Sequence, residues 1–150
     1  MSTRANVKVT DSFGDELWFY RHSDGYPEGT LPTLKIFCDW VREGRIRDNC
    51  GQACGWLILI GASEYSKVWR TVDGELKQVD KETIMEPISG DSFMGWKCSS
   101  YEPATCAAGD AEFLYTIDLD EKTISVECIN SGKTVSVSFI FSPDLQELYV

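Results

Sequence analysis

The stretch AEFLYTIDLDEKTISVECI, residues 111–129, decides the fold class of this 150-residue chain. Apolar and polar residues alternate on both sides of a polar turn at residues 118–122. Such alternation is typical of strands with one face on a core and the other in water. The segment TVSVSFIF, residues 134–141, repeats the pattern after a second short connection. Three strands joined this closely predict an antiparallel meander.

Two hairpins are predicted in addition to the meander. NVKVTD, residues 6–11, and ELWFYRH, residues 16–22, flank a short polar turn, which is the pattern of a β-hairpin. KVWRTV, residues 67–72, and ELKQVD, residues 75–80, flank an Asp-Gly pair at positions 73–74. That dipeptide favours the two-residue turn of a tight hairpin, so a second hairpin is predicted there.

Helical spacing of apolar residues predicts two helices between the hairpins. Thr30 is expected to cap the first helix, with Pro32 in its first turn, and Gly44 is expected to end it. The second helix is expected to begin at Asp48 or Asn49. Its nearly continuous apolar centre indicates burial against the sheet.

Together these elements predict an α+β fold, with two helices packed on one face of a mainly antiparallel sheet. With 43% hydrophobic residues, residues 1–150 are expected to form a single globular domain. The longest apolar run, WLILI at 56–60, is far too short to cross a bilayer, and the N-terminal residues lack the apolar region of a secretory signal. We therefore expect a cytoplasmic protein without membrane contact.

The net charge of −10 is concentrated in the second half of the chain. Residues 1–75 carry nine Lys and Arg against eleven Asp and Glu, whereas residues 76–150 carry five against thirteen. Such a surface repels phosphate backbones, so direct binding of nucleic acid is not expected. The one basic strip, Arg42, Arg45 and Arg47, lies where the first helix ends, and it suits the negative end of the helix dipole.

Six cysteines raise the question of disulfides or a metal. A cytoplasmic chain keeps its thiols reduced, which argues against a disulfide framework. Candidates for a four-thiolate zinc site are Cys50, Cys54, Cys98 and Cys106, because the first two share one face of a helix. The usual spacing in such sites is C-x2-C, however, so we expect buried free thiols and neither a metal nor another cofactor.

The segment YRHSDGYPEGT, residues 20–30, contains the only histidine. Turn chemistry explains its glycines, its proline and its acidic residues. The alternative is a small nucleotide-binding protein or hydrolase in which Arg21 binds a phosphate and His22, beside Asp24, transfers a proton. Alternation along the strand places Arg21 and His22 on opposite faces, so the turn is the favoured interpretation and an enzyme the less favoured one.

The signature RHxDGYPxG at residues 21–29 is followed by an amphipathic helix, then by GWLIL at 55–59, YEPAT at 101–105 and GDAEFLYTID at 109–118. In these scattered blocks the chain resembles a family of small uncharacterised proteins of phages, prophages and bacteria. The resemblance implies no activity and no catalytic residue. It does imply a mobile-element context, in which small acidic proteins bind and inhibit host proteins.

The resulting hypothesis is an acidic protein-binding module of phage type. Its carboxylates would replace phosphates in the basic groove of a nucleic-acid-binding host or defence protein. The residues expected to bind are Asp110, Glu112, Asp118, Asp120 and Glu121. Acidity that only confers solubility is one alternative. Another is a homodimer whose interface is formed by surplus aromatic residues, such as Trp18, Trp40, Trp69 and Trp96.

Overall fold

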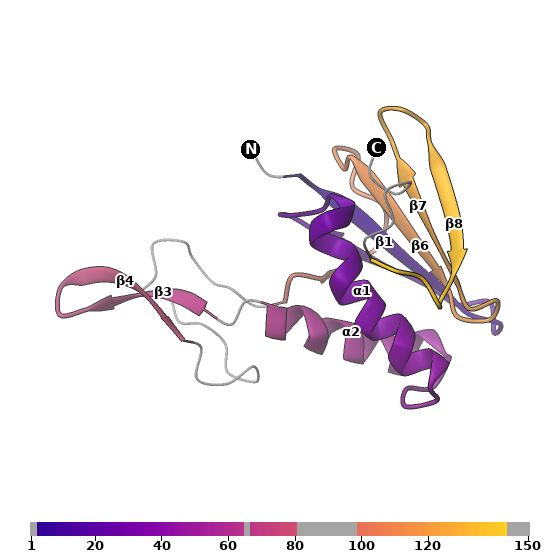
Figure 1. Cartoon of the computed structure of the whole chain (residues 1–150), viewed down its shortest axis with the longest axis horizontal. Coiled ribbons are helices and arrows are strands. Elements are labelled where there is room, and N and C mark those ends of the chain that lie inside the picture. Colours follow the sequence, from indigo (N-terminus) through magenta and orange to yellow (C-terminus); the bar gives the residue numbers. More distant parts are fainter. Residues whose placement is uncertain (1–2, 65–66, 81–98, 144–150) are drawn as a thin grey trace.

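The computed structural model describes residues 3–64, 67–80 and 99–143. Its main element is a six-stranded sheet in the order β5-β2-β1-β6-β7-β8, with two helices on one face (Figure 1). The strands of this sheet are β1 (Ala5–Thr10), β2 (Glu16–Arg21), β5 (Glu102–Ala104), β6 (Phe113–Asp118), β7 (Thr123–Cys128) and β8 (Thr134–Ser138). The α+β fold is thereby confirmed.

The meander β6-β7-β8 and the hairpin β1-β2 pair antiparallel, as predicted. The two units are joined by one parallel pairing at the centre of the sheet, in which β1 lies beside β6 with Ala5 opposite Phe113 and Thr10 opposite Asp118. Because parallel neighbours end at the same edge, the turn after β1 lies next to the turn after β6. This juxtaposition brings the carboxylates of the two turns together at one edge of the sheet.

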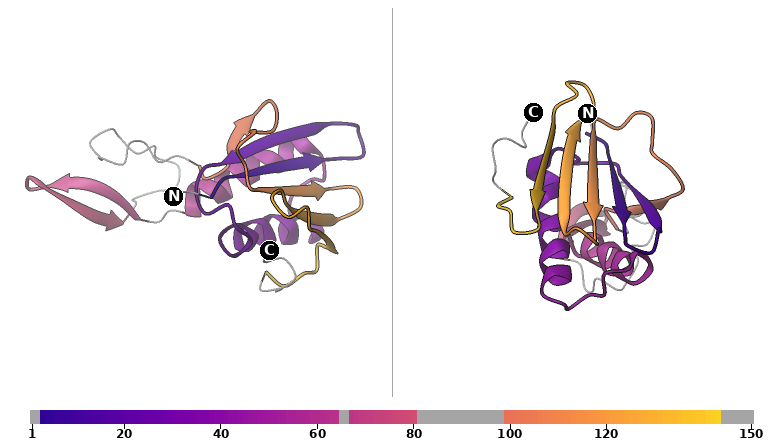
Figure 2. Two further views of the ribbon diagram at one scale, coloured as in Figure 1. Left: turned by 90° about the horizontal axis from the view of Figure 1, so that it is seen from above. Right: turned by 90° about the vertical axis from the view of Figure 1, so that its right-hand side faces the viewer.

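Alternation along the strands gives the sheet one buried face and one face turned to solvent. On β6 the odd-numbered side chains are buried and the even-numbered ones are partly exposed. The two helices cover the buried face of the sheet (Figure 2). The inward side chains of the sheet form one core with those of the helices. The largest apolar side chains that are almost completely buried in this core are Leu31, Leu34, Phe37, Leu57, Tyr101, Tyr115, Ile117, Leu119, Ile124 and Phe139.

The first helix, α1 (Pro27–Arg42), begins three residues before the predicted cap. Pro27 occupies the first turn, where its fixed φ suits a helix and its missing N–H costs nothing. Thr30 is therefore not the cap but lies inside the helix, where its hydroxyl donates to the carbonyl of Asp24 at 2.9 Å. The predicted end is confirmed, because Gly44, just beyond the helix, has a φ of 76° that favours glycine.

The second helix, α2 (Cys50–Glu64), starts directly after the predicted cap position. It is apolar on nearly every side and packs on both the sheet and α1. Its first amide is capped from another element, since the N–H of Cys50 donates to Asp11 Oδ2 at 2.7 Å. A carboxylate at this position is favoured by the positive end of the helix dipole, so the β1-β2 turn and α2 stabilise each other.

The hairpin of β3 (Lys67–Val72) and β4 (Glu75–Asp80) forms a separate two-stranded sheet. Asp73 and Gly74 have φ values of 53° and 79°, the positive pair that a type I′ turn requires, so the predicted turn is confirmed. In Figure 1 this hairpin extends away from the six-stranded sheet. Residues 81–98 and the C-terminal LQELYV lie outside the described residues.

Candidate functional site

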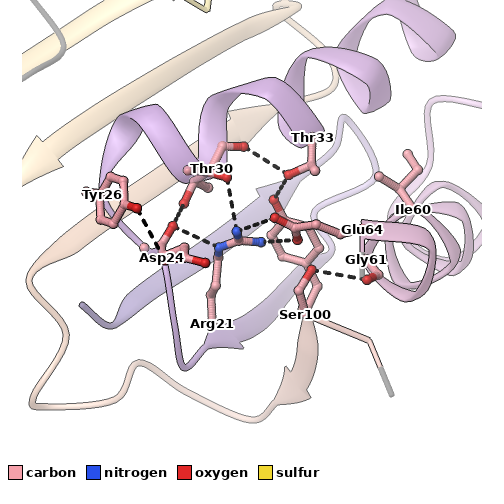
Figure 3. Close-up of polar contacts among 12 residues, drawn as sticks. Arg21, Asp24, Tyr26, Thr30, Thr33, Ile60, Gly61, Glu64 and Ser100 are labelled. Carbon is pink, nitrogen blue, oxygen red and sulfur yellow. Dashed lines mark hydrogen bonds and ion pairs between the residues drawn. The ribbon is translucent and has the colours of Figure 1, made fainter. Parts of the chain in front are cut away.

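Arg21, the last residue of β2, is completely buried. Its guanidinium lies between the start of α1 and the end of α2, where it meets the carboxylate of Glu64 (Figure 3). Nη1 donates to Glu64 Oε2 at 2.7 Å and Nη2 donates to Glu64 Oε1 at 2.6 Å. This bidentate ion pair joins the sheet to the end of α2 within the core.

Backbone carbonyls and an aromatic ring surround the rest of the guanidinium. Nε donates to the carbonyl of Asp24 at 3.2 Å, and Nη2 also donates to that of Gly29 at 3.0 Å. The ring of Tyr101 lies 5.2 Å from the guanidinium carbon, and its hydroxyl contacts that of Thr33. Burial raises the pKa of Tyr101. Because its guanidinium is enclosed in this way, the geometry does not support a phosphate-binding role for Arg21.

The remaining residues of the signature shape the turn into α1. Asp24 has a positive φ of 57°, and its carbonyl receives the bonds from Arg21 and Thr30. At Gly25 an added Cβ would lie 2.8 Å from the carbonyl oxygen of Thr3, and at Gly29 it would lie 2.5 Å from that of Asp24. The backbone can approach so closely only where side chains are absent. The signature therefore specifies a structural turn.

His22 is exposed and faces away from this network. Its Nδ1 lies 2.9 Å from the hydroxyl of Tyr20, while the carboxylate of Asp24 accepts from the hydroxyl of Tyr26 at 3.3 Å. Arg21, His22 and Asp24 therefore do not converge on a common point. A general base beside a phosphate-binding arginine requires such convergence, so the geometry does not support the catalytic alternative.

The five carboxylates expected to bind a partner fall into two groups at opposite ends of β6. Asp110 and Glu112 precede the strand, and Asp110 Oδ2 lies 3.2 Å from Nη1 of Arg4. Asp118 is the last residue of the strand, and Asp120 and Glu121 follow it. Six residues of strand separate the groups by roughly 20 Å. The five residues expected to bind therefore do not form one continuous surface.

The second group joins carboxylates from the first half of the chain. The N–H of Leu119 donates to the carbonyl of Thr10 at 2.9 Å, which sets the β6-β7 turn against the β1-β2 turn, as Figure 1 shows. Nζ of Lys122 donates to Asp48 Oδ2 at 3.3 Å, which adds the loop before α2. We call this surface the acidic end, and its carboxylates belong to Asp11, Asp15, Asp48, Asp118, Asp120 and Glu121.

Two of these carboxylates maintain the turns that carry the others. Asp118 Oδ1 accepts from the amides of Asp120 and Glu121, each at 3.0 Å. Asp11 Oδ1 accepts from the amides of Phe13 and Asp15, each also at 3.0 Å. Backbone amides, above all that of Cys50 at the start of α2, hold the pKa of Asp11 below its usual range. Both turns are therefore ordered by their own side chains.

Phe13, at the tip of the β1-β2 turn, is 71% exposed. An ordered turn holds this large apolar side chain in water beside Asp15, which is also exposed. The residues predicted from the sequence to bind a partner did not include Phe13, Asp11, Asp15 or Asp48. The alternating pattern gave no indication of the parallel pairing that brings the two turns together.

The described cysteine candidates for a zinc site form no metal-binding group. In residues 3–64, 67–80 and 99–143 no group of three or more His, Cys, Asp or Glu side chains could hold a metal. Cys50 and Cys54 are buried in α2, where the Cys50 thiol donates to the carbonyl of Val9 at 3.3 Å. Cys106 is exposed, and Cys98 lies outside the described residues.

The thiols are expected to differ in reactivity with iodoacetamide at neutral pH. Burial raises the pKa of Cys50 and of Cys54 to about 12 and that of Cys38 still further, so almost no thiolate forms. Peptide mass spectrometry of the native protein should find Cys106 alkylated first and these three only after unfolding. Alkylation of Cys54 as fast as Cys106 would contradict the burial of α2.

Of the tryptophans proposed for a dimer interface, the two whose side chains the structure describes lie in different layers of the fold. Trp18 lies on the solvent face of the sheet, where its Nε1 donates to Glu16 Oε2 at 2.8 Å. Trp40 lies in the helical layer, edge-on to Trp56 at 6.2 Å between ring centroids. The side chains of Trp69 and Trp96 are outside the described part of the chain. Trp18 and Trp40 therefore do not belong to one surface.

Neither described helix is long and apolar enough to cross a membrane. No family model, no curated protein and no solved structure matches this chain.

Proposed function

We propose that this protein is a protein-binding module that engages a basic partner through the acidic end. The observation that carries the proposal is the meeting of three loops that each bear carboxylates, one of which also presents the exposed Phe13. Asp15, Asp120 and Glu121 are exposed, and the side chain of Asp48 is 62% exposed. Lys122 Nζ contacts Asp48, so the lysine of the β6-β7 turn offsets part of this charge and leaves an excess of carboxylates.

The arrangement combines the two contributions that a specific protein interface needs. Clustered charge accelerates encounter with an oppositely charged surface and selects against acidic partners. Phe13 adds an apolar anchor that a pocket on the partner can bury, and exposed aromatic side chains of this kind supply much of the affinity in protein interfaces. Because Asp11 bonds to the amides of the turn, little conformational entropy is lost when Phe13 is bound.

The partner class that fits is a basic, nucleic-acid-binding protein whose groove accepts carboxylates in place of phosphates. The resemblance to phage and prophage proteins supports a host or defence protein in this role, with inhibition as the outcome. Such a partner should be released by added DNA, which competes for the same groove.

The test is a capture experiment from host lysate that compares the wild type with one triple variant and one double variant. D15N/E121Q/D120N removes three charges of the acidic end, yet it leaves Asp11 and Asp118 to maintain the turns. D110N/E112Q neutralises carboxylates at the far end of β6 and is the control. We expect one basic protein to bind the wild type and the control at ~0.1 M salt and to be lost from the triple variant.

Two further conditions identify the kind of contact. Binding should weaken at least tenfold at about 0.5 M salt, since contacts between exposed charges are screened. F13A should weaken binding without changing its salt dependence, because it removes an apolar anchor and no charge. Binding that is equal for the wild type and the triple variant, or insensitive to salt, would refute the proposal.

A further inference from the structure

Strand β8 is the outer strand of the sheet beyond β7, and its far side has no partner strand among the described residues. The N–H of Cys128 donates to the carbonyl of Lys133, and the N–H of Phe139 donates to that of Lys122, each at 2.9 Å. The backbone C=O of residue 133 and the backbone N–H of residue 139 thus point toward β7. Since backbone groups alternate along a strand, those of Thr134, Ser136 and Ser138 point away from the sheet.

Within the residues that the structure describes, the edge of β8 lacks the devices that usually prevent strand addition. Natural edges are blunted by short length, proline, charge or a bulge. The opposite edge of this sheet, β5, has three of them, because it contains only Glu102–Ala104 and includes the charged Glu102 and Pro103. By contrast β8 spans five residues, TVSVS, with no charge and no proline. The pairing of β8 with β7 keeps a regular register from Thr134 to Ser138, so no bulge protects this edge.

We propose that β8 pairs antiparallel with β8 of a second copy of this chain, around a two-fold axis at Ser136. The sequence TVSVS reads almost the same in both directions, so the register is self-complementary. Ser136 lies opposite Ser136 of the second copy, and Val135 lies opposite Val137. The outward-facing residues exchange backbone hydrogen bonds, and the two six-stranded sheets become one continuous sheet.

The charge distribution favours a second copy in this orientation. Thr123, which follows the acidic end, is opposite Ser138, so the acidic end lies at the carboxyl end of β8. Antiparallel pairing places the acidic ends of the two copies at opposite ends of the joined sheet, whereas parallel pairing would set them side by side. Antiparallel pairing also brings Lys133 of each copy close to the acidic end of the other copy. The proposal is independent of the partner proposed above.

The inner and outer faces also continue across the junction. Val135 and Val137 are half-buried against the core, and Thr134, Ser136 and Ser138 are exposed on the solvent face. Pairing of the two valines across the axis extends the apolar side that packs under the sheet. The hydroxyl-bearing residues meet on the solvent face, where no carboxylate of β8 opposes its counterpart.

Sedimentation velocity of the full chain from ~1 μM to ~1 mM tests this pairing. We expect a concentration-dependent dimer, which S136P abolishes because proline removes an outward N–H and leaves the bonds to β7 intact. S136K and S136E, which place like charges opposite each other, should each dimerise about fivefold more weakly, and their mixture should recover a heterodimer. T105K adds the same charge near the opposite edge, after β5, and should dimerise like the wild type.

Amide hydrogen exchange separates a second copy from another segment of the same chain. The amides of Thr134, Ser136 and Ser138 should become protected only as the concentration rises. Protection already at ~1 μM, a wild type that is monomeric up to ~1 mM, or a mixture of S136K and S136E that recovers nothing would each overturn the proposal.

Discussion

Replacement of Arg21 with methionine should lower the free energy of unfolding by roughly 3–5 kcal/mol. The guanidinium is completely buried and forms a bidentate pair with Glu64, whose side chain is 18% exposed. Its removal leaves a carboxylate in the core without its cation. It also leaves the carbonyls of Asp24 and Gly29 without these donors at the start of α1. Urea unfolding followed by circular dichroism measures the loss.

A double variant separates the ion pair from general damage to the core. R21M/E64L replaces both charges by apolar groups, and buried pairs replaced in this way are often neutral or better in stability. We therefore expect the double variant to recover most of the loss seen in R21M. If R21M/E64L is less stable than R21M, the stranded carboxylate is not the cause of the destabilisation. If R21M unfolds like the wild type, Arg21 is not a structural residue.

Replacement of Gly61 with alanine should destabilise the protein by about 1–3 kcal/mol, although alanine is intrinsically the better helix former. An added Cβ at Gly61 would lie 2.8 Å from Cδ2 of Tyr101 and 3.0 Å from Oγ of Ser100, and it would also meet Ser99. The segment 99–101 rests directly on this turn of α2, where the amide of Ser100 donates to the carbonyl of Gly61 at 3.2 Å. Thermal unfolding of G61A measures the effect.

Gly55, in the same helix, provides the matched control. No atom lies within 4 Å of a Cβ added there, and the residue is exposed. G55A should therefore raise the free energy of unfolding by about 0.5–1 kcal/mol, the ordinary gain of alanine over glycine in a helix. Opposite signs for the two substitutions would confirm the close contact at Gly61. A gain at both positions would contradict it.

The candidate site was only partly accessible to prediction from the sequence. Asp118, Asp120 and Glu121 could be identified as a turn rich in carboxylates because they are adjacent in the chain. Phe13 and Asp48 could not be added to them, since their proximity arises from contacts between elements far apart in sequence. The signature around Arg21 was interpreted correctly as a turn, yet its partner Glu64 is 43 residues away.

Local chemistry determined most of the secondary structure of this chain. Alternation predicted the meander, an Asp-Gly pair predicted the turn between β3 and β4, and Gly44 predicted the end of α1, because each depends on neighbouring residues only. The start of α1 was predicted three residues too late, because Thr30 was expected to be its cap. In the structure the first turn of α1 is supported by Pro27 and by the hydrogen bond from the hydroxyl of Thr30 to the carbonyl of Asp24.

Only the tertiary structure decided how the hairpin and the meander combine. The parallel pairing of β1 with β6 joins segments that are more than a hundred residues apart, and no local pattern encodes a partner strand at that separation. The choice depends on the apolar area that both units bury together under α1 and α2, a quantity summed over the whole core. The acidic end and the open edge at β8 both follow from that pairing and the strand order it sets.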